Sequence, residues 1–157
     1  MRILAIDPGP VESAWVLWDT KKHDFIKPLS GRNKGLEQNN KVIGMLPFLA
    51  DGDIDLVAIE MISSYGLSVG RSTLITCCVV GQIIQKCMDN NIPFKLYGRP
   101  TIKGQIGGRT DAEIRSSLRI RYGESRKGEK LEGVKNDIWS SLALAVALEE
   151  NPALKEW

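Results

Sequence analysis

The order of apolar patterns along the chain limits its fold more than any other feature of the sequence. Three short β-rich runs come first, at 3–6, 13–18 and 25–29, with brief polar links between them. Helical and strand patterns then alternate. Short links favour an antiparallel meander, and strand–helix alternation favours parallel pairing with helices on the sheet faces. We therefore expect an α/β fold in which a mixed five-stranded sheet carries helices on both faces.

The elements after residue 30 are predicted from apolar periodicity and from capping signals. Thr110 and Glu113 form a capping box at the start of one helix, and Asn136 or Asp137 is expected to cap the last one. The predicted helices span 34–50, 72–88, a short segment after Pro100, 110–122 and 137–150, and the predicted later strands span 56–60 and 92–97.

Length and composition predict one domain over 1–157, because 157 residues can bury a full core. The sequence has neither an apolar run of about 18 residues, as a membrane span requires, nor a secretory signal pattern at its start. Cys77, Cys78 and Cys87 stand in one apolar stretch, which is neither a disulfide framework nor a zinc spacing. We expect buried, reduced thiols in a cytoplasmic protein.

The basic residues are unevenly distributed. Residues 95–135 hold eleven Lys or Arg and five Asp or Glu, a net charge of +6, so the rest of this +2 chain carries −4. Such a segment is either a solvated helix face or a surface that binds a polyanion.

Two acidic residues stand where apolar strand patterns end, Asp7 after 3–6 and Glu60 after 56–59, and Asp137 opens the last helix. Taken singly, Asp7 can be a turn former before Pro-Gly and Asp137 a favourable helix-terminal charge. Sites in α/β sheets, however, assemble at the carboxyl ends of strands. If the three carboxylates converge, their repulsion favours a bound hard cation such as Mg²⁺ or Mn²⁺.

Four segments of the chain together resemble the RuvC-type Holliday junction resolvases of the ribonuclease H-like superfamily. They are the opening RILAIDPGP, the central LVAIEMISS, the basic segment 95–135 and the closing KNDIWSSLALAVALEE. Residues 133–137 look most like the phage-encoded branch. The resemblance covers nearly the whole chain. It implies a ribonuclease H-like fold and a homodimeric endonuclease that cuts four-way DNA junctions with divalent metal, in the cytoplasm of the cell or of a phage host.

The resemblance also implies roles for individual residues in a hydrolysis that uses two Mg²⁺ or Mn²⁺ ions per site. Asp7 matches the first-strand Asp that bridges the two ions, and one ion activates water while the other stabilises the leaving oxygen. Glu60 matches the acid that ends the fourth strand. Asp137 matches the first acidic or His position of the final helix.

The chain departs from the family pattern at Ser140, where a second acid usually stands three residues after the first. Either Asp137 itself takes over the role of the missing acid, or Ser140, Asn136, or a water held by either completes the metal shell. If Ser140 lies outside that shell, Asp111 or Glu132 is the alternative carboxylate.

DNA contacts are expected from the loop after Glu60 and from basic side chains. Ser64 and Tyr65 occupy the place where the family inserts residues at the junction centre, and Tyr65 can stack on a base or wedge the crossover. The expected phosphate contacts are Arg71, Arg99, Lys103, Arg109, Arg115 and Arg119.

A dimer is expected through the helix over 72–88, which is apolar on more than one face. The predicted interface residues are Leu74, Ile75, Val79 and Ile83.

Two alternative functions remain open on the sequence alone. One is a different ribonuclease H-like nuclease, which processes ribosomal RNA or cuts RNA–DNA hybrids. The other is a non-catalytic protein that binds junctions with a decayed site, an alternative motivated by Ser140.

Overall fold

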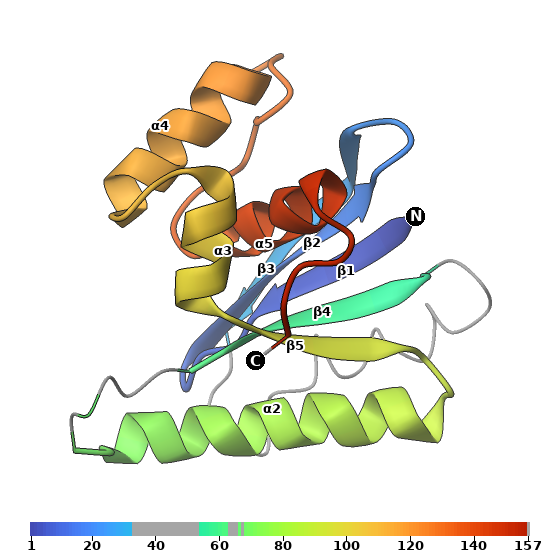
Figure 1. Ribbon diagram of the computed structural model, residues 1–157, viewed down its shortest axis with the longest axis vertical. Coiled ribbons are helices and arrows are strands. Elements are labelled where there is room, and N and C mark those ends of the chain that lie inside the picture. Colours follow the sequence, from blue (N-terminus) through green and yellow to red (C-terminus); the bar gives the residue numbers. More distant parts are fainter. Residues whose placement is uncertain (33–53, 63–65, 67, 157) are drawn as a thin grey trace.

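The computed structural model describes residues 1–32, 54–62, 66 and 68–156. At its centre is a five-stranded sheet in the order β3-β2-β1-β4-β5 (Figure 1). β1, β2 and β3 pair antiparallel, whereas β4 pairs parallel with both β1 and β5. The mixed sheet predicted from the pattern order is therefore confirmed. The strands are β1 Arg2–Asp7, β2 Glu12–Asp19, β3 Asp24–Arg32, β4 Leu56–Met61 and β5 Phe94–Gly98.

Helices cover both faces of the sheet (Figure 1). α2 lies along one face, and α3, α4 and α5 lie on the other. None of the helices in the described part of the chain is long and apolar enough to cross a membrane. The predicted helix over 34–50 falls outside the described residues. The helices are α2 Arg71–Asp89, α3 Arg99–Ile106, α4 Asp111–Tyr122 and α5 Ile138–Glu150.

The predicted capping box is present at the start of α4. The Thr110 side chain accepts a hydrogen bond from the amide of Glu113, and the Glu113 carboxylate accepts one from the amide of Thr110. These two bonds satisfy amides that have no partner within the helix. They fix where α4 begins, and with it the turn that joins α3 to α4.

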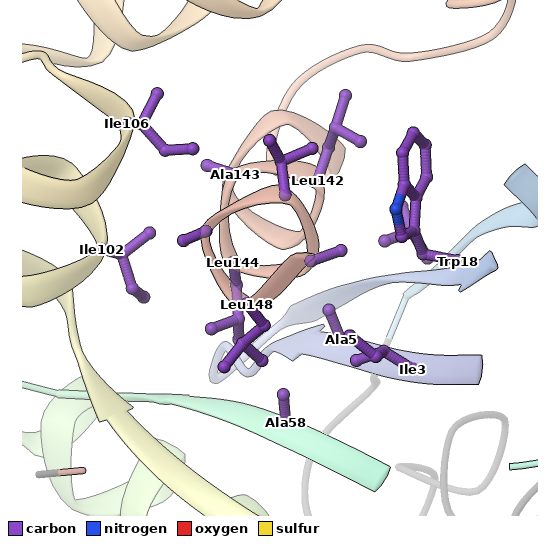
Figure 2. Packing of buried hydrophobic residues seen from close by; sticks show 14 of the residues in the cluster. Ile3, Ala5, Trp18, Ala58, Ile102, Ile106, Leu142, Ala143, Leu144 and Leu148 are labelled. Atoms are coloured by element: carbon purple, nitrogen blue, oxygen red, sulfur yellow. The ribbon is translucent and has the colours of Figure 1, made fainter. Parts of the chain in front are cut away.

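α5 forms the middle of the larger core. Its Ala- and Leu-rich sequence has no polar face, so it is buried on almost every side. Figure 2 shows Ile3, Ala5 and Ala58 of the sheet on one side of it and Ile102 and Ile106 of α3 on another. This packing holds the first turn of α5 in a fixed place beside the sheet.

α2 covers the opposite face of the sheet with one side only. Val79, Ile83 and Cys87, spaced by four residues, are buried in a second core with residues of β1, β2 and β4. The expectation that Val79 and Ile83 face a partner is therefore wrong, because their side chains lie inside their own chain.

The outward side of α2 carries Leu74 and Met88, which are 58% and 59% exposed. Ile75 is half-buried at the margin. Cys77 and Cys78 are also exposed, so the expectation of buried thiols holds only for Cys87. A helix repeats every 3.6 residues, and these positions fall on the opposite side from the stripe that meets the sheet.

Candidate active site

Three parallel strands bring their carboxyl ends to one edge of the sheet. The register pairs Ile6 with Ile59, which sets Asp7 beside Glu60. Glu60 in turn pairs with Tyr97 of β5, and Arg99 begins α3 two residues later. The two acids predicted at strand ends are thus brought to the same edge, and a basic residue follows the third strand there.

The turn after Asp7 is fixed by Gly9. A Cβ atom at this position would lie 2.2 Å from the carbonyl oxygen of Glu12, so only glycine fits. The Gly9 amide donates a hydrogen bond to the Ser13 hydroxyl at 3.2 Å. β1 therefore ends sharply at Asp7, and the chain turns back into β2.

The first turn of α5 supplies Asp137 and Ser140. Asp137 precedes the helix, and its carbonyl oxygen accepts the amides of Ser140 at 3.0 Å and Ser141 at 3.3 Å. Its carboxylate makes no capping bond, because Asp137 already has helical backbone angles. Asn136 before it adopts φ +47°. Asp137 therefore stands at the N-cap position as expected but makes no side-chain capping bond, and its carboxylate remains available to the site.

The electrostatics of Asp7 show that the predicted acids are neighbours. The pKa of Asp7 is raised to about 7, chiefly by burial and also by the negative charges of Glu60 and Asp137, while Arg99 and a hydrogen bond from Ser140 oppose the shift. The pKa of Glu60 is also raised, by burial above all, against the opposing charge of Arg99. Three carboxylates and one hydroxyl thus lie near enough at this edge for their charges and dipoles to influence one another.

Arg99 binds two acids at once. Its Nη1 donates to Glu60 Oε1 at 2.6 Å and its Nη2 donates to Asp111 Oδ1 at 3.0 Å. Lys103, one turn further along α3, reaches the same Asp111 oxygen at 2.7 Å. Arg99 and Lys103 were predicted as phosphate contacts. In the structure both are engaged by acids of the chain itself, because α3 begins at the edge where Glu60 stands near the end of β4.

An open cleft of about 450 Å³ lies over this cluster. Ile102, Ile114 and Trp139 form an apolar wall. The polar lining consists of Glu60, Arg99, Lys103, Asp111, Arg115, Asp137 and Ser140. A second hollow of about 700 Å³ lies along the turn from Asp7 to Glu12. Asp137 lines both hollows, so it stands between the acid cluster and the surface on either side.

The donor set at this edge fits a hard divalent cation. Asp7, Glu60, Asp137 and Ser140 offer only oxygen ligands, which Mg²⁺ and Mn²⁺ prefer. The three carboxylates also carry more negative charge than the one guanidinium of Arg99 offsets. Within the described ranges, however, no three His, Cys, Asp or Glu side chains are arranged as a ready metal-binding group.

Two further predicted DNA contacts lie near the cleft. Arg115 lines it. Arg119 stacks over the Trp139 ring, 5.3 Å from its centroid, and pairs with Glu124 at 3.4 Å. Arg119 is therefore partly occupied within the chain, whereas Arg115 is exposed at the cleft wall.

The other predicted contacts lie further out. Arg109 is exposed in the turn between α3 and α4, and Arg71 is exposed at the start of α2. Ser64 and Tyr65 fall outside the described residues. Glu132 accepts the Gly128 amide at 2.7 Å within its own loop.

Asp111 was predicted only as an alternative carboxylate, and the structure places it in the cleft through its contacts with Arg99 and Lys103. The predictions from sequence missed this network. The rule that located Asp7 and Glu60, a charged residue at the end of a strand pattern, applies equally to Arg99, which directly follows β5. This position of Arg99 was the signal in the sequence that could have revealed the network.

Comparisons with known proteins place the fold. No family model matches the chain, and no curated protein matches it. Among solved structures, Thermus thermophilus RuvC in complex with a Holliday junction substrate aligns with a TM-score of 0.74 at 15% identity, over 100% of this chain and 99% of that one. The T. thermophilus RuvC structure alone gives 0.71 at 14% identity over 100% of both chains.

The Holliday junction resolvase of fowlpox virus aligns with a TM-score of 0.53 at 15% identity, over 96% of this chain and 99% of that one. The chain therefore has the ribonuclease H-like fold of RuvC and other Holliday junction resolvases. At these identities the likeness shows the fold alone.

Proposed function

We propose that this chain is a metal-dependent endonuclease that cleaves branched DNA, with four-way junctions as its main substrate. The observation that carries the proposal is the convergence of Asp7, Glu60 and Asp137 at one edge of a RuvC-type sheet. The basic wall of the adjoining cleft supports it, since phosphate groups bind where Lys and Arg gather.

The residues of the chain would divide the work as follows. Asp7, Glu60 and Asp137 would hold Mg²⁺ or Mn²⁺, with two ions per site, and the Ser140 hydroxyl fixes the Asp7 carboxylate by donating to it. Bound divalent ions supply charge neutralisation and an activated water at neutral pH. Arg115 at the cleft wall would orient the DNA backbone by pairing with phosphate oxygens.

DNA would reach the site along the surface of α3 and α4. Arg109 and Arg115 are exposed there, and Arg71 is exposed at the start of α2. Ser64 and Tyr65 are proposed to contact the junction centre. The rest of the chain carries a net charge of −4 and would repel the DNA phosphates, which would keep the DNA on the basic side.

A second copy of the chain is the proposed partner of the outward face of α2, since a four-way junction has two strands to cut symmetrically. Leu74→Asp tests this, because Leu74 is exposed and its substitution does not disturb the core. Light scattering is expected to give a dimer for the wild type and a monomer for the variant. A monomeric wild type that cuts junctions fully would overturn the dimer.

We further propose that residues 1–157 form one nuclease domain and that the chain belongs to the phage-encoded branch of the resolvases. We propose the cytoplasm of a cell or of a phage host as its place of action.

The deciding experiment compares substrates and metals. A synthetic four-way junction, a linear duplex and an RNA–DNA hybrid are each incubated with Mg²⁺, with Mn²⁺ and with chelator. We expect metal-dependent cleavage of the junction above the other two. Preferred cleavage of the hybrid would indicate a different ribonuclease H-like nuclease. Tight junction binding without cleavage in either metal would indicate a non-catalytic binding protein.

A further inference from the structure

The ion pair between Arg99 and Glu60 occupies a carboxylate that the proposed metal site needs. The Glu60 side chain is only 8% exposed, and Arg99 Nη1 lies 2.6 Å from its Oε1 atom. A buried carboxylate is costly without a counter-charge, so Arg99 stabilises Glu60 where it stands. A cation that coordinates this oxygen has to compete with the guanidinium.

Asp111 offers Arg99 a second partner on the solvent side. Its side chain is 53% exposed, and it already accepts from Arg99 Nη2 at 3.0 Å. The guanidinium is planar and carries five donors, so it can give up one acid while it keeps the other. The pKa of Asp111 is lowered by hydrogen bonds from Lys103 and Arg99, which keeps this acceptor charged.

We infer that Arg99 is a positioning residue that competes with a divalent cation for Glu60, with Asp111 as the partner that retains Arg99 when the cation binds. The inference rests on the proposed function, in which Glu60 is a metal ligand. In this role Arg99 holds the buried Glu60 carboxylate in place without metal and lowers the affinity of the site for the cation.

The first test measures Mn²⁺ affinity from the electron paramagnetic resonance signal of free Mn²⁺, without DNA or turnover. Arg99→Gln frees Glu60. We expect this variant to bind Mn²⁺ roughly tenfold more tightly than the wild type, because an opposite charge in contact with a carboxylate shifts its proton affinity by a comparable factor. Lys103→Gln is the matched control. It removes one positive charge from the same network, but the residue that pairs with Glu60 remains.

We expect a clearly smaller gain for Lys103→Gln, because Lys103 pairs with Asp111 and lies further from Glu60 than the contacting Arg99 does. Equal gains for both variants would show an effect of net charge alone and would overturn the inference. Unchanged affinity in Arg99→Gln would overturn it as well.

The second test concerns Asp111 as the alternative partner. Asp111→Asn is expected to weaken Mn²⁺ binding in the wild type, because Arg99 then has only Glu60. In the Arg99→Gln background the same change is expected to have little further effect. An equal weakening in both backgrounds would mean that Asp111 acts through its own charge, and the proposed role of Asp111 would fail.

Two controls separate this inference from the proposed function and from misfolding. If Glu60→Gln leaves Mn²⁺ affinity unchanged, the proposed metal site itself fails. If Glu60→Gln weakens binding while Arg99→Gln matches the wild type, only the inference about Arg99 fails.

Circular dichroism checks that Arg99→Gln is folded. If it is not, Arg99→Lys takes its place, because lysine keeps the charge but lacks the fork that bridges two acids. A smaller tightening of Mn²⁺ binding is then expected, and unchanged affinity contradicts the inference.

Discussion

Both ends of α5 carry acidic residues, but their surroundings differ: the acids at one end are paired with donors of the chain, and the acid at the other end lies near further acids. At its C-terminal end, Glu149 accepts from the Trp18 indole and meets His23 Nδ1 at 2.6 Å, and Glu150 pairs with Arg121. At its N-terminal end, Asp137 joins Asp7 and Glu60, and this cluster has the Arg99 guanidinium in contact with Glu60.

The contrast separates acids that stabilise the fold from acids whose mutual repulsion favours the binding of a cation. Glu149 ties the β2–β3 hairpin to the end of α5, since Trp18 and His23 both belong to that hairpin region. Asp7, by contrast, has a pKa raised to about 7 because it is buried beside two other acids. Stability is commonly sacrificed at functional sites, and the N-terminal end of α5 fits this pattern.

The largest expected effect comes from Asp7→Asn. We expect junction cleavage to fall by on the order of a thousandfold or more, because the acid that holds the ions is lost. Junction binding should persist or tighten, since the change removes a charge that repels phosphate. Single-turnover cleavage and gel-shift titration measure the two effects. Glu149→Gln, at the other end of α5, should retain cleavage, and parallel loss of binding and cleavage in Asp7→Asn would indicate misfolding.

A smaller effect is expected where the chain departs from the resolvase pattern. Ser140→Asp adds a carboxylate near the start of α5, where a negative charge is tolerated. It should lower the Mg²⁺ concentration for half-maximal cleavage by roughly tenfold, because a carboxylate is the better ligand for a hard cation. An unchanged Mg²⁺ requirement would place Ser140 outside the metal shell and would leave Asp111 as the acid to test next.

The smallest effect concerns the basic surface around the cleft. Arg109→Gln or Arg115→Gln should each reduce the slope of log binding constant against log salt by about one unit, if each contacts one phosphate. Arg119→Gln should change the slope less, because Arg119 is already engaged by Trp139 and Glu124. Salt titrations of junction binding for the three variants test the ranking, and identical slopes in all three would contradict it.

Much of the frame could be predicted from the sequence. The apolar runs that end at Asp7 and Glu60 located two strand ends, and parallel pairing of β1 with β4 brought those ends together. The Thr110 and Glu113 spacing placed the start of α4. These features are local, since each depends on a few neighbouring residues and on the spacing of apolar residues along the chain.

The rest depended on contacts between distant segments. The pairing of Arg99 with Glu60 joins residues 39 apart and needs β4 and β5 side by side. The sides of α2 could not be assigned from a helix apolar all round, so Val79 and Cys77 were both placed wrongly. Asn136 or Asp137 was expected to cap α5. Asp137 does occupy the N-cap position, but its helical backbone angles leave its side chain without the capping bond.

The most direct test of the contrast between the two ends of α5 is the free energy of unfolding of Asp7→Asn and Glu149→Gln, measured in chelator at pH 8. The unfolded Asp7 loses its proton near 3.8, whereas the folded one retains it to about 7. Wild-type stability should therefore fall as pH rises through this window, and ionised Asp7 is a cost at pH 8.

We expect Asp7→Asn to be more stable than the wild type by about 1–2 kcal/mol, and Glu149→Gln to be less stable by about 1–3 kcal/mol because the hydrogen bonds of a charged group are weakened. Destabilisation of both variants by similar amounts would contradict the account, because it would show that the acids at the two ends of α5 are equally well partnered.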